Sequence, residues 1–421
     1  MSFQKSVLDN GITVISEFMP SVRSISLGLW FNVGSRDELP HQRGLAHFME
    51  HMMFKGTPTR TPLDISMHFD RLGAEFNAFT SKEYTCFYAR FVDEKLKSAL
   101  EVLADMVINS SFDEEAITTE REVVLEEITR SYDAPDDFVF DFFSQSMMQN
   151  HPLGLPVLGD KELVSNFTHS DCMAFHESHY GTGNLCIAVA GNIDHDELVS
   201  YVREYFSSMR VLKKASRDLS PVTFKSGIFS QKRDIEQAHI IGGFPSLPSG
   251  HEKRFALGML TSILGGSMSA RLFQEVREKR GLAYSIYATQ GIFQGAGQWC
   301  VYAGTRPDNV GQVINLVRKE LASLAEGNLD QDELDRNIDL ICGQAVLGFE
   351  TTSSHMMRLG KRETLGLPHL SIDESIQKFR EVTCKDVVSM AEFIFDAKPT
   401  IAVVSPLEEG ELLSLIEDES N

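Results

Sequence analysis

Two histidines, His47 and His51, stand four residues apart, with Glu50 directly before the second, in the pattern H-x-x-E-H. On a helix, residues four apart lie on one face, so both imidazoles can reach one Zn²⁺ ion, for which neutral imidazole is a preferred ligand. Glu50 projects from the same face, where a carboxylate can take a proton from a water activated by the metal. The alternative is a pair of histidines that only pack within a helix, and a third ligand is needed to decide.

A third ligand is available in the helix predicted from 113 to 131, where Glu120 and Glu127 fall on the apolar stripe. Seven residues turn a helix by about 700°, so the two carboxylates point within about 20° of each other, toward the core. Ionised carboxylates on a buried face are costly unless they are paired or bind metal. We predict Glu127 as the third zinc ligand and Glu120 as the carboxylate that orients a ligating histidine. The alternatives are a helix twisted enough to expose both, or pairing with Arg121 and Arg130.

The residue order in H-x-x-E-H is the reverse of H-E-x-x-H and is typical of the inverted zinc peptidases. With Glu127 as third ligand, the sequence predicts one Zn²⁺ per chain, with Glu50 as the catalytic base. A second pattern, at His176 and His179, has its histidines three apart and no third acid to complete a site. We interpret that pair as structural.

The elements that must position these residues alternate between strands and helices. The predicted strands cover 12–17, 25–33, 75–79 and 83–91, and the predicted helices cover 43–55, 95–109 and 113–131. Strands grouped together and followed by helices predict an α+β fold with mainly antiparallel strands.

The chain also repeats itself at an offset of 214 to 215 residues. Residues 88–89 match 302–303, residues 187–189 match 401–403, and residues 167–171 match 382–386. Because this offset is about half of the chain, we predict a tandem duplication. The predicted parts are an N-terminal zinc-binding domain (1–210), a linker (211–230) and a homologous C-terminal domain without zinc (231–421). The linker region is polar and basic, and we interpret it as a solvated tether lying on acidic surfaces, with a docking site as the alternative.

The second copy is an internal control for the metal site. Alignment places Asn337 opposite Glu120 and Gln344 opposite Glu127, and glycines stand opposite the H-x-x-E-H helix. Neutral amides and glycines cannot make the same zinc site. Only the first copy is therefore predicted to bind the metal.

The composition sets limits on the class of protein. Hydrophobic residues make up 42% and charged residues 24% of the 421, which is typical of globular domains and excludes global disorder. The net charge is −21, from 39 basic and 60 acidic residues, which disfavours binding to nucleic acid or to an anionic membrane. The sequence shows no secretory or transit segment and no membrane-spanning run, and its six cysteines are scattered. We expect a cytoplasmic protein with reduced thiols and no membrane insertion.

These residues together resemble the pitrilysin-like M16 metallopeptidases, in particular the half-size members similar to the β subunit of mitochondrial processing peptidase. Members of that family share H-x-x-E-H and a glutamate 76 positions beyond the second histidine, which is Glu127 here, with a further acid seven positions earlier, at Glu120. The resemblance covers essentially the whole chain. It implies two tandem homologous α/β-roll domains of the LuxS/MPP-like metallohydrolase fold, which form a clam-like chamber.

The resemblance also implies roles that the spacing does not. In such enzymes, a strand at the position of Asn77, Ala78 and Phe79 offers main-chain groups to an extended substrate. Arg277 and Tyr284 match a pair that binds the substrate's main chain and stabilises the oxyanion. From the residues alone, 76–79 is ordinary sheet core and Arg277 belongs to a solvated charge run.

The function implied is that of a zinc-dependent endopeptidase that cleaves unfolded peptides or presequence-like segments inside a closed chamber. Bacterial relatives of this type pair as homodimers, and we expect a bacterial homodimer here. Two alternatives stay open: a non-catalytic partner or structural subunit of the same fold, and a subunit of an obligate heterodimeric processing peptidase.

Overall fold

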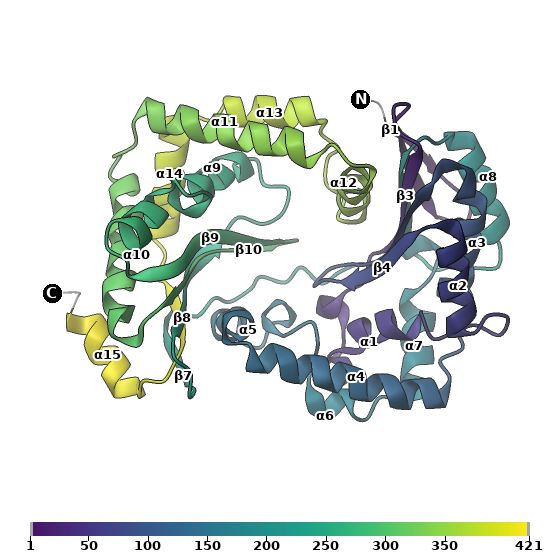
Figure 1. Cartoon of the computed structure of the whole chain (residues 1–421), viewed down its shortest axis with the longest axis horizontal. Helices are drawn as coiled ribbons and strands as arrows, with labels where there is room; N and C mark the ends of the chain where they lie inside the picture. Colours follow the sequence, from purple (N-terminus) through teal and green to yellow (C-terminus); the bar gives the residue numbers. More distant parts are fainter. Residues whose placement is uncertain (1–2, 419–421) are drawn as a thin grey trace. The chain divides into compact units, whose positions relative to one another are not determined.

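The computed structural model describes residues 3–418 and groups them into two compact units, each built from three segments (Figure 1). Unit 1 takes the described residues up to Arg130, then Leu155–Asp218 and Gly348–His369; unit 2 takes Ser131–Gly154, Leu219–Leu347 and the described residues from Leu370 onward. Each unit contains one sheet and its own helices, so the predicted α+β class is confirmed.

The sheet of unit 1 has six strands in the order β1-β2-β6-β3-β5-β4. The strands are β1 (Phe3–Val7), β2 (Thr13–Phe18), β3 (Ser24–Phe31), β4 (Glu75–Thr80), β5 (Thr85–Val92) and β6 (Leu185–Gly191). All neighbouring pairs are antiparallel except β2 with β6. The mainly antiparallel sheet agrees with the prediction, and the hairpin β4–β5 lies at one edge of it.

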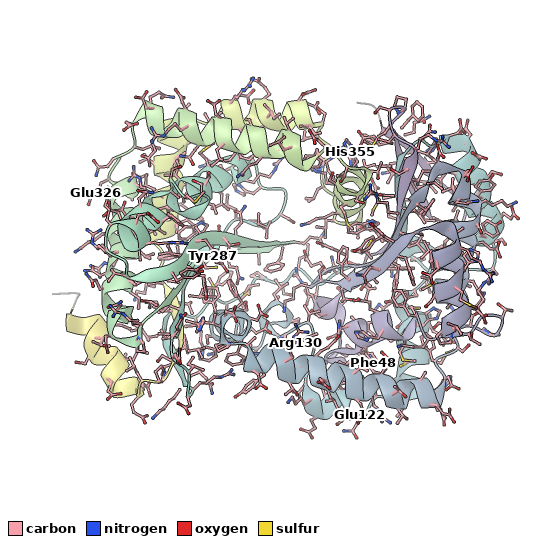
Figure 2. All side chains as sticks on the ribbon, in the orientation of Figure 1. Phe48, Glu122, Arg130, Tyr287, Glu326 and His355 are labelled. Atoms are coloured by element: carbon pink, nitrogen blue, oxygen red, sulfur yellow. The ribbon has the colours of Figure 1, made fainter. Side chains whose placement is uncertain are left out.

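The helices of unit 1 are α1 (Leu45–Met52), α2 (Pro62–Leu72), α3 (Leu96–Asn109), α4 (Glu114–Asp133), α6 (Lys161–Val164), α7 (His169–His179), α8 (His195–Tyr205) and α12 (Thr352–Thr364). Alternate residues of the central strands supply two cores, as a strand buried on both faces requires. Leu27 and Leu29 of β3 join the larger core with Phe48 of α1, whereas Trp30 packs on the other face against Met356 of α12. Phe48 is labelled in Figure 2.

The second face of this sheet is covered by a helix from far along the sequence. α12 contacts β2, β3 and β6, and its Gly360 comes so close to Trp30 that an added Cβ would lie 2.1 Å from the indole nitrogen. Its Arg358 and His355 reach the buried Glu17 of β2. The sequence reading did not predict this placement, because helical periodicity shows which face is apolar but not which sheet covers it.

The sheet of unit 2 has the order β7-β11-β8-β10-β9. Its strands are β7 (Gly227–Lys232), β8 (Ala238–Ser246), β9 (Ala283–Phe293), β10 (Ala296–Thr305) and β11 (Thr400–Ser405). Its helices are α5 (Pro135–Met147), α9 (Arg254–Gly265), α10 (Val310–Ala325), α11 (Gln331–Gly348), α13 (Ile372–Arg380), α14 (Cys384–Phe395) and α15 (Glu409–Asp418). Here α5, from early in the sequence, packs on β8 and β11, as α12 packs on the sheet of unit 1.

Apart from β1, which has no counterpart among the described residues of unit 2, the two sheets have equivalent strand orders, as a duplication requires. β6 and β11, which carry the matching residues 187–189 and 401–403, each lie between an edge-side parallel neighbour and a central antiparallel one. Thr168 caps α7 and Thr383 caps α14, and each forms a capping box with the aspartate three residues later. The duplicated sequence therefore corresponds to duplicated structure, although the boundaries predicted at 210 and 230 stay a prediction.

The basic segment between the copies is tied to unit 1 rather than fully solvated. Arg217 donates two hydrogen bonds of 2.8 Å to Asp37 and one of 2.6 Å to the main-chain oxygen of Glu83. Arg36 in turn donates to Glu83 at 2.7 Å, and all of these side chains are buried or nearly so. The segment does lie on acidic side chains, but Arg217 is part of a buried ionic cluster.

All six cysteines are free, and five of them are buried, as predicted. Within residues 3–418, none of the helices is both long enough and apolar enough to cross a membrane.

Candidate metal centre

The helix that carries His47, Glu50 and His51 is α1, which is shorter than the predicted 43–55. It begins after Gly44, whose φ of 94° favours glycine and which has no side chain to cap the helix. Glu38 supplies that cap from outside, because its carboxylate accepts hydrogen bonds from the main-chain N–H groups of Gly44 (3.0 Å) and Ala46 (2.7 Å). Burial raises the pKa of Glu38 to about 8, and the two main-chain hydrogen bonds oppose the rise.

The three predicted ligands converge on one point. Oε2 of Glu127, from α4, lies 3.7 Å from Nε2 of His47 and 3.4 Å from Nε2 of His51. All three ligand atoms fall within 4.8 Å of one another. A tetrahedral zinc ion with bonds of roughly 2.1 Å needs ligand atoms roughly 3.4 Å apart, so the spacing suits this ion with little movement.

The hydrogen bonding of these atoms also fits a cation. Glu127 Oε2 is buried and has no hydrogen-bond partner, although the rest of that side chain is partly exposed. Burial and the neighbouring His51 lower the pKa of His47 to about 3, which keeps its imidazole neutral. A buried acceptor atom facing two imidazole nitrogens is costly without a proton or a metal between them. The residues present therefore fit Zn²⁺.

Glu120 lies where the sequence placed it, behind a ligating histidine. Its Oε2 is 3.1 Å from Nδ1 of His51, and the residue is only 4% exposed. The suggested pairing with Arg121 does not occur, because that guanidinium donates to Ser165 and Thr118. The hydrogen bond fixes which ring nitrogen of His51 remains available for a metal.

Lys55 is a member of this group that the sequence reading missed. Its Nζ lies 2.6 Å from Oε1 of Glu120 and neutralises the buried carboxylate. The sequence does hold a clue to it, since Lys55 stands four residues after His51 within the predicted helix 43–55, although in the structure it lies just beyond the end of α1.

The side chain of Glu50, on α1, contacts the edge strand β4. Thr80, the last residue of β4, donates from Oγ1 to Oε2 of Glu50 at 2.6 Å. Burial raises the pKa of Glu50, and the nearby Glu127 adds to the rise, while hydrogen bonds from Thr80 oppose it. A carboxylate with a raised pKa beside the three ligands is suited to accept a proton and to return it.

Asn77, Ala78 and Phe79 lie on β4, which is the last strand of its sheet. β4 pairs with β5 on one side, and among the described residues no strand pairs with its other edge. The ring of Phe79 packs against Trp30, Tyr84 and Tyr88, so its side chain is part of the sheet packing. In the described part of the chain, this edge of β4 is therefore not paired with another strand, although the main-chain N–H of Ala78 donates a hydrogen bond of 2.8 Å to Oδ1 of the neighbouring Asn77.

Arg277 and Tyr284 belong to unit 2, where they lie side by side. The guanidinium of Arg277 stacks 4.7 Å from the ring centre of Phe273 and 5.0 Å from that of Tyr284. Arg277 comes from a π-helical turn at Phe273–Glu278, a rare geometry that occurs frequently at functional sites. Tyr284, at the start of β9, is 76% exposed. The guanidinium of Arg277 is therefore packed against two aromatic rings rather than fully solvated.

The equivalent place in unit 2 is held by uncharged groups. There, Ser262 of α9 donates a hydrogen bond of 2.8 Å to Asn337 of α11, the residue aligned with Glu120. Across residues 3–418, His47, His51 and Glu127 form the one group of three side chains with metal-binding geometry. His176 and His179 are accounted for otherwise, because His176 bonds to the main-chain oxygen of Val107 and His179 packs on Phe175.

Comparison with protein families gives two matches. Residues 13–161 match the model described as insulinase (peptidase family M16), and residues 166–341 match the model described as the peptidase M16 inactive domain. The first match contains the whole metal group, and the second contains Asn337.

Curated relatives cover nearly the entire chain. An uncharacterized zinc protease of Streptomyces coelicolor is 41% identical over 413 residues, which are 96% of this chain and 90% of the relative. The uncharacterized zinc protease YmxG of Bacillus subtilis is 40% identical over 397 residues, which are 94% of this chain and 97% of the relative.

Solved structures show the same fold at lower sequence similarity. A protease from Helicobacter pylori superposes with a TM-score of 0.90 at 22% identity, covering 96% of this chain and 100% of that one. A structure described as a peptidase M16 inactive domain, from Pseudomonas fluorescens, gives a TM-score of 0.91 at 20% identity, with coverages of 97% and 99%.

Proposed function

The chain belongs to peptidase family M16 and is similar to bacterial zinc proteases, and from this premise we propose that it is a zinc-dependent endopeptidase with one Zn²⁺ per chain. His47, His51 and Glu127 would hold the metal, and Glu50 would be the general base. The observation that carries the proposal is the convergence of three ligand atoms within 4.8 Å, with the raised-pKa carboxylate of Glu50 on the same helix.

Zinc, when bound, would polarise the scissile carbonyl and make water acidic enough to be deprotonated near neutral pH. Glu50 takes a proton from the attacking water as the oxygen adds to the carbonyl carbon. It then gives that proton to the leaving nitrogen as the C–N bond breaks. Burial of Glu50 supports both steps, because it raises the pKa of the carboxyl group toward the working pH.

The proposed substrates are unfolded peptides or presequence-like segments. The free edge of β4 can accept one extended chain as an additional strand through the main chain of Asn77 and Ala78, beside Phe79. A folded segment has already paired its main-chain groups, so an unfolded one is favoured. The same proposal assigns Arg277 and Tyr284 to the substrate's main chain and to the developing oxyanion.

Further parts of the proposal come from the family resemblance. We propose a homodimer, with the two homologous units of each chain enclosing the substrate in a chamber. The six free cysteines separately support the proposal of a cytoplasmic location. The alternatives are a non-catalytic subunit and an obligate heterodimer. Size-exclusion chromatography of the purified chain, with peptidase activity measured in each fraction, separates these possibilities. Activity in a homogeneous fraction that contains this polypeptide and no other excludes both alternatives.

Metal removal tests the proposal. We expect a chelator to abolish cleavage of an unfolded peptide, zinc to restore it, and mass spectrometry to locate the cleaved bonds inside the peptide. Equal cleavage by the metal-free protein would contradict the zinc role, and removal of terminal residues alone would contradict the endopeptidase assignment.

A further inference from the structure

Thr80 connects the edge strand to the general base. It ends β4, and its hydroxyl donates to Glu50 Oε2 at 2.6 Å. A hydrogen bond to an ionised carboxylate is stronger than one between neutral groups. In residues 3–418, the Thr80 hydroxyl is the one side-chain donor bonded to Glu50.

The hydroxyl has another acceptor within reach but is aimed at Glu50. Oγ1 of Thr85, the partner of Thr80 in the β4–β5 ladder, lies 3.4 Å away, a much weaker contact. The Thr85 hydroxyl is itself engaged, because it donates to the main-chain oxygen of Val33 at 3.0 Å. Thr80 is therefore oriented toward the base rather than across the hairpin.

The turn that carries Thr80 is anchored at several points. Main-chain N–H groups of Ser35 and Arg36 donate to the oxygens of Ser81 and Lys82, and Arg217 donates to that of Glu83. The position of the Thr80 hydroxyl is thus set by the β3–α1 loop and by the segment that joins the two sequence copies. A donor fixed in this way can hold a flexible glutamate side chain in one rotamer.

We propose that Thr80 is a positioning residue for Glu50: it holds one carboxylate oxygen on the edge strand, so that the strand which receives the substrate also sets the direction of the base. This inference rests on the proposed function of Glu50. Thr80 acts through Glu50 and is assigned no contact with the reacting atoms. Misplacing a base by about 1 Å can lower the rate about 100-fold, so the effect belongs in kcat.

The test compares two substitutions, each of which removes one feature of the Thr80 side chain. Thr80→Val keeps the shape and removes the donor, whereas Thr80→Ser keeps the donor and removes a methyl group. With one zinc per chain verified in each variant, we expect Thr80→Val to lower kcat roughly 10- to 100-fold with KM changed less than about 3-fold. We expect Thr80→Ser to stay within about 3-fold of the parent kcat. A Thr80→Val variant with the parent kcat, or a Thr80→Ser variant as slow as Thr80→Val, would overturn the inference.

A second measurement does not depend on activity. If the bond exists, Thr80→Val lowers the melting temperature by about 2–4 °C in the parent chain and by less than about 1 °C in a Glu50→Ala background, where the acceptor is gone. Equal shifts in both backgrounds would overturn the inference even if the chain cleaves no peptide. A zinc-loaded parent chain that cleaves no more than Glu50→Gln contradicts the proposed function instead, so the two failures are distinguishable.

Discussion

Lys55 and Glu120 form an ion pair of 2.6 Å, and the other oxygen of Glu120 lies 3.1 Å from Nδ1 of His51. Lys55 therefore contacts Glu120, which in turn contacts His51, a predicted zinc ligand. Glu120 is 4% exposed and would be a costly buried anion without it. The lysine therefore compensates the buried charge of Glu120 and holds the carboxylate beside the imidazole.

Removing this lysine should weaken the metal site without touching a ligand. We expect Lys55→Met to lower zinc affinity roughly 10-fold, within the range known for groups behind metal ligands. Lys55→Arg should keep most of the affinity because it keeps the charge. Competition with a chelator of known affinity measures both variants, and an unchanged dissociation constant for Lys55→Met would show that the ion pair does not support the site.

The duplicated chain offers a matched pair of positions for testing the third ligand. We expect Glu127→Ala to weaken zinc binding by at least about 100-fold, more than the loss of a supporting carboxylate, because a ligand itself is removed. Gln344→Ala, at the aligned position of the second copy, should leave zinc binding unchanged. Zinc content after dialysis measures both, and equal zinc in the two variants would exclude Glu127 as a ligand.

Glu17 should be the residue on which the docking of α12 depends. Its carboxylate is 2% exposed, accepts from Arg358 at 2.8 Å and lies 3.1 Å from His355 (Figure 2 labels His355 on α12). Glu17→Ala removes the buried carboxylate that Arg358 and His355 face, so the free energy of unfolding should fall by about 3–5 kcal/mol.

Urea unfolding followed through Trp30, which contacts α12, measures this loss. The control is Glu408→Ala, which breaks the exposed pair with Lys232 and should change the free energy of unfolding by less than about 0.5 kcal/mol. A loss for Glu17→Ala no larger than for the control would show that α12 is held by its apolar contacts alone.

The same cluster predicts how stability depends on pH. His355 Nε2 faces the main-chain oxygen of Phe349 and Nδ1 faces Glu17, so both ring nitrogens meet acceptors, as suits an imidazolium. The hydrogen bond to Glu17 raises the pKa of His355 despite burial. Burial by itself would raise the pKa of Glu17, but His355 and Arg358 together lower it.

The directions of the pKa shifts of His355 and Glu17 define the pH range in which this cluster stabilises the fold. The contribution of His355 is fully present below its unfolded pKa of about 6.5 and is lost as the pH rises through its higher folded value. The contribution of Glu17 is present above its unfolded pKa of about 4.3 and is lost as the pH falls through its lower folded value. We therefore expect the stability difference between the parent chain and His355→Gln to be largest near pH 5–6 and to shrink toward pH 9. A difference that grows with pH would contradict this account.

The parts of the site that could be predicted from sequence are those fixed within one helix. The spacing of His47, Glu50 and His51, and that of Glu120 and Glu127, sets the angles between side chains wherever the helix lies. The α+β class and the duplication were predictable for a similar reason, since local patterning determines which elements form and its repetition shows that they form twice.

The rest depends on how elements pack, which local patterning does not contain. Thr80 and Glu50 are 30 residues apart, and their bond exists only because the hairpin lies on α1. Glu38 caps α1 from six residues before Gly44. Lys55 supports the site only through its contact with Glu120, which lies on another helix. The exchange of α5 and α12 between the sequence halves is likewise decided by which exposed sheet face each apolar helix covers.

The most direct test of the central claim is peptide cleavage by Glu50→Gln with its zinc content measured in the same sample. The substitution keeps the size of the side chain and removes its ability to accept a proton at neutral pH, while the three ligands are untouched. The account predicts one zinc per chain and a kcat lowered by at least about 100-fold, the scale of general base catalysis. Undiminished cleavage with zinc bound would contradict it.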